Sequence, residues 1–220
     1  MPIMGFVGKL EEVRARARQR IEDGAVTKDY PLDRDQVISV LNEALATEIV
    51  CVLRYQFHYF MATGIHSKAI AEEFREHAEE EQAHAGRIAE RIKQLGGKPE
   101  MNPIAVAKAS HTEYKEGVSL ADMIREDLVA ERIVIETYRE MTHFFGQKDP
   151  VSRRMMEEIL AKEEEHADEL ADLLFAVEPE TGEVSSRLYF KDEIPGESDA
   201  GKYVKTTATV KHSAKKAARR

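Results

Sequence analysis

The sequence contains the motif Glu-x-x-His twice in helix-forming stretches, and this repetition constrains the fold more than any other feature. Glu81 and His84 form the first copy within AEEFREHAEEEQAHA, which has no Gly or Pro. Glu163 and His166 form the second copy within AKEEEHADEL. Residues three positions apart lie on one face of a helix, so each carboxylate and imidazole can bind the same divalent metal ion. A single copy would be weak support in a chain this rich in Glu.

Each motif also has a Glu and a Tyr upstream at matching distances. Glu48 lies 33 residues before the Glu of the first motif, and Glu131 lies 32 residues before the Glu of the second. A Tyr follows each of these upstream acids by seven positions, at Tyr55 and Tyr138. The order Glu, Tyr, Glu-x-x-His therefore occurs twice, and this repeat organises the chain.

Hydrophobic periodicity and helix-end signals predict four long helices around this repeat. The predicted spans are 33–63, 67–95, 119–146 and 149–176. Three of these helices begin at good N-cap residues, Asp33, Ser119 and Asp149. Only a few residues join the first two helices, so we expect them to be antiparallel neighbours. Glu48 lies within the apolar stripe of the first helix, where a charge needs an explanation.

A much longer connection, residues 96–118, separates the second and third helices. It contains Asn102-Pro103 followed by IAVAKA, which predicts a short helix with Pro at its first position. A long crossover is expected where the second and third helices of a bundle run parallel. The sequence therefore predicts an all-α fold, with a four-helix bundle over residues 31–177.

The two ends of the chain differ from this bundle. Apolar residues at helical spacing within 1–30 predict an arm with a short amphipathic helix that ends near Gly24: Val7, Leu10, Val13, Ala17 and Ile21. Residues 178–220 turn to Pro, Gly, Ser and Thr, which predicts an extended, partly disordered tail. Residues 201–220 hold seven Lys or Arg and no acid, whereas the first 200 residues carry a net charge of −16.

Several protein classes are not expected from this composition. No apolar run approaches ~18 residues, so we expect no membrane span. The N-terminus lacks the apolar core of a secretory signal peptide, which favours the cytoplasm. The single cysteine, Cys51, cannot form an internal disulfide or a Cys-rich metal site, and its apolar neighbours indicate a packing role.

Six side chains of the repeat would meet inside the bundle: Glu48, Glu81, His84, Glu131, Glu163 and His166. Buried carboxylates are costly unless they are paired or bind metal, and two divalent cations would balance these four. One Glu from each of two helices, with a Glu-x-x-His from each of the other two, is the pattern of di-iron and di-manganese bundles. Oxygen and imidazole ligands suit Fe, Mn or Zn, so the ligand types leave the metal open.

We expect Glu81 and Glu163 to bridge the two metal ions. Glu48 with His84 would complete one position, and Glu131 with His166 the other. Two metals about 4 Å apart can each give one electron to dioxygen or peroxide. The plain alternative is a bundle with six solvated surface residues, and the doubled spacing argues against it.

Other polar residues near the repeat lie outside this set of six. Glu140 and His143 form a third Glu-x-x-His, which helical geometry places on the outer face of its helix. His77 and Glu80 are interpreted as polar residues that lie at the surface or contact the metal ligands from outside, with a transient iron site as the alternative. Tyr55, like Tyr138, is either a core tyrosine or an electron donor, and it stays among the catalytic candidates.

At these residues the chain resembles the ferritin superfamily, and bacterioferritin most closely. The likeness covers about residues 36–175 and includes LNEALATEIVCVLRY, EEEQAHAGRIAERIKQLGGKP, IREDLVAERIVIETYRE and SRRMMEEILAKEEEHADEL. All six ligand positions match. The resemblance implies a ferroxidase centre with two Fe ions inside each subunit of a hollow cage that stores ferric mineral.

Three departures from bacterioferritin matter. The haem-ligating Met of that family is replaced by Gln82, so haem is not expected. The family's iron-binding His of the inner surface is replaced by Glu76, and no clear fifth helix follows Ala176. The long crossover and basic tail instead resemble Dps-like mini-ferritins, which form 12-subunit cages and in some cases bind DNA through basic termini. The cage could therefore have 12 or 24 subunits.

The sequence thus predicts a ferroxidase that oxidises Fe(II) with O2 or H2O2 and stores iron in a homo-oligomer. A second hypothesis is a Dps-like particle whose tail, Lys202–Arg220, binds DNA, and a soluble disordered tail is its alternative. A third hypothesis is a di-manganese catalase. A rubrerythrin-type peroxidase is excluded, because its second iron site needs four Cys.

Overall fold

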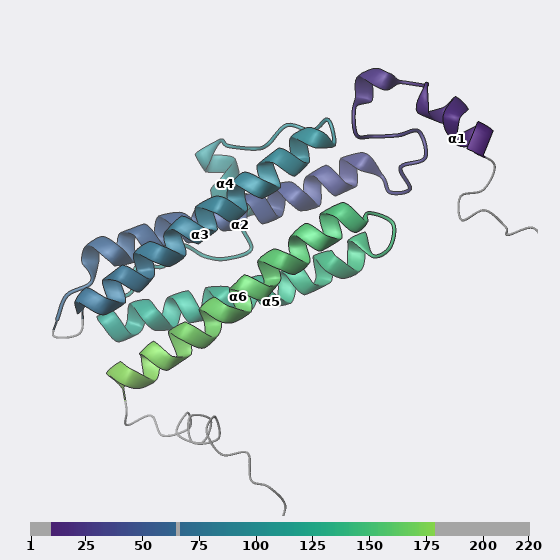
Figure 1. The fold of residues 1–220 in the computed structure, drawn as a ribbon. Helices are drawn as coiled ribbons and strands as arrows, with labels where there is room; N and C mark the ends of the chain where they lie inside the picture. The colour runs from purple at the N-terminus through teal and green to yellow at the C-terminus, as the bar shows by residue number, and fades with distance from the viewer. Residues whose placement is uncertain (1–9, 65–66, 179–220) are drawn as a thin grey trace, which may run out of the picture. The chain divides into compact units, whose positions relative to one another are not determined.

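The computed structural model describes residues 10–64 and 67–178, and all regular secondary structure in these ranges is helical. The elements are α1 (Leu10–Ala17), the 3-10 helix η1 (Ile21–Asp23), α2 (Arg34–Met61), α3 (Ser67–Gln94), α4 (Pro103–Ala109), α5 (Leu120–Phe145) and α6 (Pro150–Val177). In Figure 1, α2 lies beside α3 and α5 lies beside α6. The predicted all-α four-helix bundle is confirmed. Val7 of the arm and the basic tail lie outside the described residues.

Side-chain caps start the helices where the sequence predicts. Asp33 accepts a hydrogen bond from the Gln36 backbone N–H at 3.0 Å, and Ser119 accepts one from the Asp122 N–H at 3.2 Å. Asn102 and Asp149 cap α4 and α6 in the same way, each with Pro at the first helical position. These caps satisfy backbone N–H groups that have no partner within the helix.

The predicted arm helix differs in extent. It breaks after Ala17, and Arg20 takes a left-handed conformation with φ of 53° before the short η1 begins. Leu10 is 51% exposed and Ile21 is 75% exposed. Because this segment buries so little apolar surface, tertiary packing does not hold it in one continuous helix.

The bundle core consists of two apolar clusters with a polar layer between them. One cluster contains Leu41, Ile92 and Phe145, and the other contains Phe74 and Leu170. Along α3 and α5 the chain passes from the second cluster to the first, whereas along α2 and α6 it passes from the first to the second. Helices α3 and α5 therefore run parallel, which is why a long crossover must join them.

The crossover between α3 and α5 is anchored on α2. Val106 of α4 packs against Ala46 and Val50. Thr47 accepts a hydrogen bond at 3.0 Å from the backbone N–H of His111. These contacts hold the crossover along the side of α2.

A buried network of polar side chains also connects the crossover to α2 and α5. Arg54 and His58 of α2 both contact Asp127 of α5, with Arg54 Nε at 2.8 Å from Oδ1 and His58 Nδ1 at 2.7 Å from Oδ2. His58 Nε2 lies 3.1 Å from the carbonyl oxygen of Lys115 and 3.0 Å from that of Glu116. Two side chains of α2 thus contact one carboxylate of α5 that is 0% exposed, and His58 links this carboxylate to the crossover.

By length and composition, α2 is the one described helix that could cross a membrane, and 56% of its apolar window is buried inside the protein. Glu48, Arg54 and His58 on this helix are at most 1% exposed. The burial of these charged and polar side chains shows that α2 packs inside the bundle.

Candidate metal centre

The polar layer of the bundle brings all six predicted site residues together. Glu48 comes from α2, Glu131 from α5, and the two Glu-x-x-His motifs come from α3 and α6. All six side chains are buried, with between 0% and 6% of each residue exposed. The site is therefore formed by the middle turns of all four long helices.

These residues form two overlapping groups whose ligand atoms lie within 4.8 Å of one another. The first group is Glu48, Glu81, His84 and Glu163, and the second is Glu81, Glu131, Glu163 and His166. Two carboxylates belong to both groups, and they are the two that the sequence assigns as bridges. The remaining residues divide into the predicted pairs.

Each histidine directs Nδ1 toward both shared carboxylates. His84 Nδ1 lies 2.9 Å from Glu163 Oε1 and 3.8 Å from Glu81 Oε2. His166 Nδ1 lies 3.1 Å from Glu81 Oε1 and 3.4 Å from Glu163 Oε2. Ligand atoms about 2.1 Å from one metal ion can be at most about 4.2 Å apart, so these separations fit a shared ion.

The same residues carry buried polar atoms that have no hydrogen-bond partner within the described part of the chain. These atoms are Glu48 Oε2, Glu81 Oε1, His84 Nδ1, Glu131 Oε2, both carboxylate oxygens of Glu163, and His166 Nδ1. A buried polar group without a partner costs about 1–3 kcal/mol, and more if it is charged. Two divalent cations would give every one of these atoms a partner, so the donor set fits a two-metal centre.

The pKa values indicate that protons occupy this site when metal is absent. Burial, reinforced by the charge of Glu81, raises the pKa of Glu48 to about 8. Burial alone would lower the pKa of His84 and His166, but the carboxylates, Glu163 first among them, raise both to about 12. A metal ion must displace these protons to bind.

Two tyrosines hold the outer carboxylates. Tyr138 donates a hydrogen bond to Glu48, and Tyr55 donates one to Glu131. Both tyrosines are 0% exposed. Each bond uses Oε1 of the carboxylate and leaves Oε2 as the atom without a partner. The tyrosines thus orient one oxygen of each carboxylate toward the centre, and a redox role for Tyr55 stays a prediction.

Three polar residues outside the set of six differ in their surroundings. Glu80 accepts a hydrogen bond from His166 Nε2 at 2.6 Å, which leaves His166 Nδ1 free for a metal ion. His77 is only 2% exposed and stacks on the ring of His166, so of the two expected positions it takes the one beside the ligand candidates and not the one at the surface. Its Nε2 lies 3.0 Å from Glu169, a partner on α6. His143 is exposed, as predicted for the third Glu-x-x-His.

Sequence reasoning missed Glu73 and Glu169, which lie around His77. Helical spacing offered a signal for each, because Glu73 is four residues before His77 and Glu169 is three residues after His166. It also missed the buried Asp127, whose partners come from α2. Arg54 and His58 are about 70 residues from Asp127 in the sequence, so spacing along one helix could not predict this contact.

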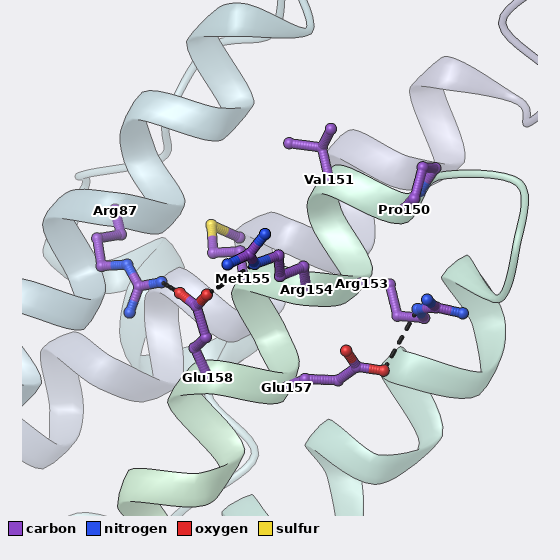
Figure 2. A pocket seen from close by; sticks show the side chains of 8 residues that line it. All are labelled: Arg87, Pro150, Val151, Arg153, Arg154, Met155, Glu157 and Glu158. Atoms are coloured by element: carbon purple, nitrogen blue, oxygen red, sulfur yellow. Dashed lines mark hydrogen bonds and ion pairs between the residues drawn. The ribbon is translucent and has the colours of Figure 1, made fainter.

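A surface hollow between α3 and α6 lies away from these six residues. Figure 2 shows Arg87 of α3 reaching Glu158 of α6 across it, and Arg153 pairing with Glu157 along α6. These are exposed ion pairs, which typically contribute ~0–1 kcal/mol. The hollow contains none of the six site residues, so we place the chemistry in the polar layer.

Comparison with known proteins agrees with this geometry. Residues 38–178 match the family of ferritin-like domains. The chain belongs to this family. A nutrient stress-induced DNA-binding protein of Synechococcus sp. is 32% identical over 142 residues, which is 63% of this chain and 81% of that protein. A bacterioferritin of Rhodobacter capsulatus is 28% identical to this ferritin-like chain over 134 residues, covering 60% of this chain and 79% of that one.

A solved structure is also similar to this ferritin-like protein. The bacterioferritin-related protein of Bacteroides fragilis, described as a dodecameric thioferritin, superposes with a TM-score of 0.64. It is 29% identical, and the match covers 73% of this chain and 94% of that chain. This protein is therefore a member of the ferritin-like family, and its relatives include a bacterioferritin, as the resemblance in the sequence implies, and a stress-induced DNA-binding protein.

Proposed function

We propose that this ferritin-like protein is a ferroxidase that oxidises Fe(II) at the six-residue centre and stores the ferric product inside a homo-oligomeric cage. The observation that carries the proposal is the pair of overlapping ligand groups that share Glu81 and Glu163. The seven buried atoms without hydrogen-bond partners support it, because two divalent cations would give each of them a partner. Kinship with bacterioferritin supports the choice of iron.

Two Fe(II) ions are the substrate in this proposal. Glu48 and His84 would hold one ion, Glu131 and His166 would hold the other, and the shared carboxylates would contact both. Each Fe(II) loses one electron. Dioxygen accepts the two electrons together with two protons and becomes H2O2, or H2O2 accepts them with two protons and becomes two molecules of water. Four carboxylates balance the charge of two divalent ions.

The remaining parts of the proposal rest on relatives and on sequence. The Bacteroides fragilis protein is described as dodecameric, which favours 12 over 24 subunits. Haem is not part of the proposal, because Gln82 stands at the position of the haem-ligating Met. The proposal places the protein in the cytoplasm. It makes Tyr55 a candidate electron donor, since its hydroxyl donates a hydrogen bond to Glu131.

The test is aerobic addition of Fe(II) to the metal-free protein while ferric absorbance is followed. We expect fast oxidation that saturates near two irons per chain, followed by slower mineral growth. Glu81→Ala should abolish the fast phase, because Glu81 belongs to both groups, and Glu140→Ala on the exposed third motif should leave it intact. Oxygen release from peroxide by the Mn(II)-loaded protein, with no iron oxidation by either oxidant, would instead identify a catalase.

A second candidate function is DNA binding by the tail. The seven Lys and Arg of residues 202–220 favour it, as does the relative named as DNA-binding in Synechococcus. The body is too acidic to contact DNA itself, with a net charge of −16 over the first 200 residues. Binding through phosphates should weaken steeply with salt, since it releases counterions. A full-length variant with the seven residues changed to Gln should lose retention of plasmid DNA and keep the ferroxidase phase.

A further inference from the structure

A third cluster of metal-ligand side chains lies next to the six-residue centre. Glu73 and His77 come from α3 and Glu169 from α6, and one ligand atom of each lies within 4.8 Å of the others. His77 Nε2 is 3.0 Å from Glu169 Oε2 and 3.6 Å from Glu73 Oε1. None of the three belongs to the two buried groups. The cluster is therefore a separate set of donors.

The histidine of this cluster is fixed in place. His77 is 2% exposed, and its ring stacks on the His166 ring with centroids 4.1 Å apart. The same ring meets Tyr55 edge-on at 5.1 Å. Within the described ranges Nδ1 has no hydrogen-bond partner, so every polar contact of His77 runs through Nε2 toward the two carboxylates. The imidazole is thus fixed with Nε2 directed toward the carboxylates of Glu73 and Glu169.

Among the described residues, no Lys or Arg neutralises the two carboxylates of this cluster. In the described part of the chain neither Glu73 nor Glu169 has a Lys or Arg ion-pair partner, whereas Glu80 on the same helix is paired with Lys162 at 3.1 Å. Burial and the nearby charge of Glu169 raise the pKa of Glu73. Two acids and one imidazole therefore form a locally negative site, and a bound divalent ion would relieve its repulsion.

The cluster is open to water where the centre is not. The Glu73 side chain is 31% exposed and the Glu169 side chain is 41% exposed, while the side chain of His166 is 0% exposed. The stacked imidazoles of His77 and His166 form the boundary between the two sets of donors. An ion held by the outer set would keep several water ligands and bind more weakly than one in the buried groups.

We propose that Glu73, His77 and Glu169 form a third divalent-cation site, solvent-accessible and adjacent to the buried pair. Mixed carboxylate and imidazole donors suit Fe(II), Mn(II), Co(II) or Zn(II). The site needs only ion binding, so the inference does not depend on whether the buried centre oxidises iron.

Zinc is a suitable probe, because it has no redox chemistry. Crystals of the full-length protein would be equilibrated with Zn(II), and anomalous diffraction at the zinc edge would locate each ion. Equilibrium dialysis with metal analysis would count zinc per chain in solution. Glu169→Gln and Glu73→Gln keep side-chain size and remove a charged ligand, and Glu140→Gln is the matched control from the exposed Glu-x-x-His.

We expect three zinc peaks per chain, one of them beside His77 Nε2. Glu169→Gln should lose that peak and bind one zinc fewer per chain in solution, with both buried peaks retained. Glu140→Gln should match the wild type. Two buried peaks with none at His77, or a third ion whose binding Glu169→Gln leaves unchanged, would overturn the inference. A peak at His77 with empty buried groups would support this site while removing the proposed centre.

Discussion

The hydroxyl of Tyr138 on α5 donates its hydrogen bond to Glu48 on α2. Tyr55 on α2 donates the equivalent bond to Glu131 on α5. Each helix carries its Tyr seven residues, about two turns, after its Glu. Because α2 and α5 run in opposite directions, the Tyr of each helix reaches the Glu of the other. The repeat in the sequence is therefore a two-fold relationship in the site.

This relationship predicts a selective effect of removing each hydroxyl. Tyr138→Phe should weaken metal binding at the position of Glu48, and Tyr55→Phe should do so at the position of Glu131, because the carboxylate loses its orienting donor. Losses of such outer partners typically reduce metal affinity about 10–100-fold. Titration with Co(II), followed by its visible absorption, measures both affinities. Tyr59→Phe, whose residue is only partly buried, is the control. Equal weakening of both positions by either variant would contradict the crossed pairing.

The shared position of Glu163 predicts a difference in stoichiometry. Glu163→Gln should reduce binding at both positions, since this carboxylate belongs to both groups, whereas Glu131→Gln should remove one ion per chain. Dialysis against Co(II) with metal analysis gives the count. Glu164→Gln changes an exposed neighbour that pairs with Arg139, and it should bind two ions in the buried groups. If Glu163→Gln lost one ion only, Glu163 would not be a bridge.

Metal removal should lower stability, because the centre then contains buried polar atoms without partners. A ligand that binds only the native state stabilises it by about 2.7 kcal/mol at 100 times its Kd. Thermal unfolding followed by circular dichroism, with and without Zn(II), should show a higher Tm in the metal-bound protein. The shift should shrink in Glu81→Ala. An equal shift in that variant would mean that zinc stabilises the protein elsewhere.

The network at Asp149 predicts a pH dependence of stability. Burial alone would raise the pKa of Asp149, but hydrogen bonds from Ser152 and Tyr30 and the charge of Arg91 lower it. The carboxylate therefore stabilises the fold above its unfolded pKa of ~3.9, and this contribution is lost as pH falls through the lower folded value. Asp149→Asn should cost about 1–3 kcal/mol at pH 7.

Urea unfolding at several pH values tests this prediction. The stability difference between the wild type and Asp149→Asn should shrink below pH ~4. Asp172→Asn, an exposed change on the same helix, should unfold like the wild type throughout. A difference that stayed constant into strong acid would show that the carboxylate charge is not what stabilises this helix start.

The sequence predicts the six-residue centre because its signals are local. Spacing of three along one helix places Glu81 with His84, and helix-forming stretches with clear caps set the elements within about two residues. Spacing of four likewise places His77 on the same face of α3 as Glu81, but its stacking on the ring of His166 depends on α6 and could not be predicted in this way. The crossed tyrosines likewise depend on which helices face each other, and spacing along one helix does not carry that information.

The contact between Arg54 and Asp127 is another relationship of this kind, and it predicts the largest loss of stability. Both side chains are at most 1% exposed, and His58 faces the same carboxylate. Asp127→Asn would leave a buried guanidinium without its counter-charge, and breaking such a pair from one side typically costs about 3–5 kcal/mol. His58 would also lose the partner that orients it toward the carbonyl oxygens of Lys115 and Glu116, so the crossover should loosen.

Chemical denaturation and hydrogen exchange separate the two effects of Asp127→Asn. The free energy of unfolding should fall by about 3–5 kcal/mol. Amides of residues 110–118 should exchange faster than in the wild type, and this increase should be larger than the increase for amides of α6. Glu136→Gln, an exposed change on the same helix, is the control. The double variant Arg54→Met with Asp127→Leu removes both charges, so it should be more stable than Asp127→Asn alone. If the double variant were the less stable of the two, packing around these side chains would matter more than the unpaired charge.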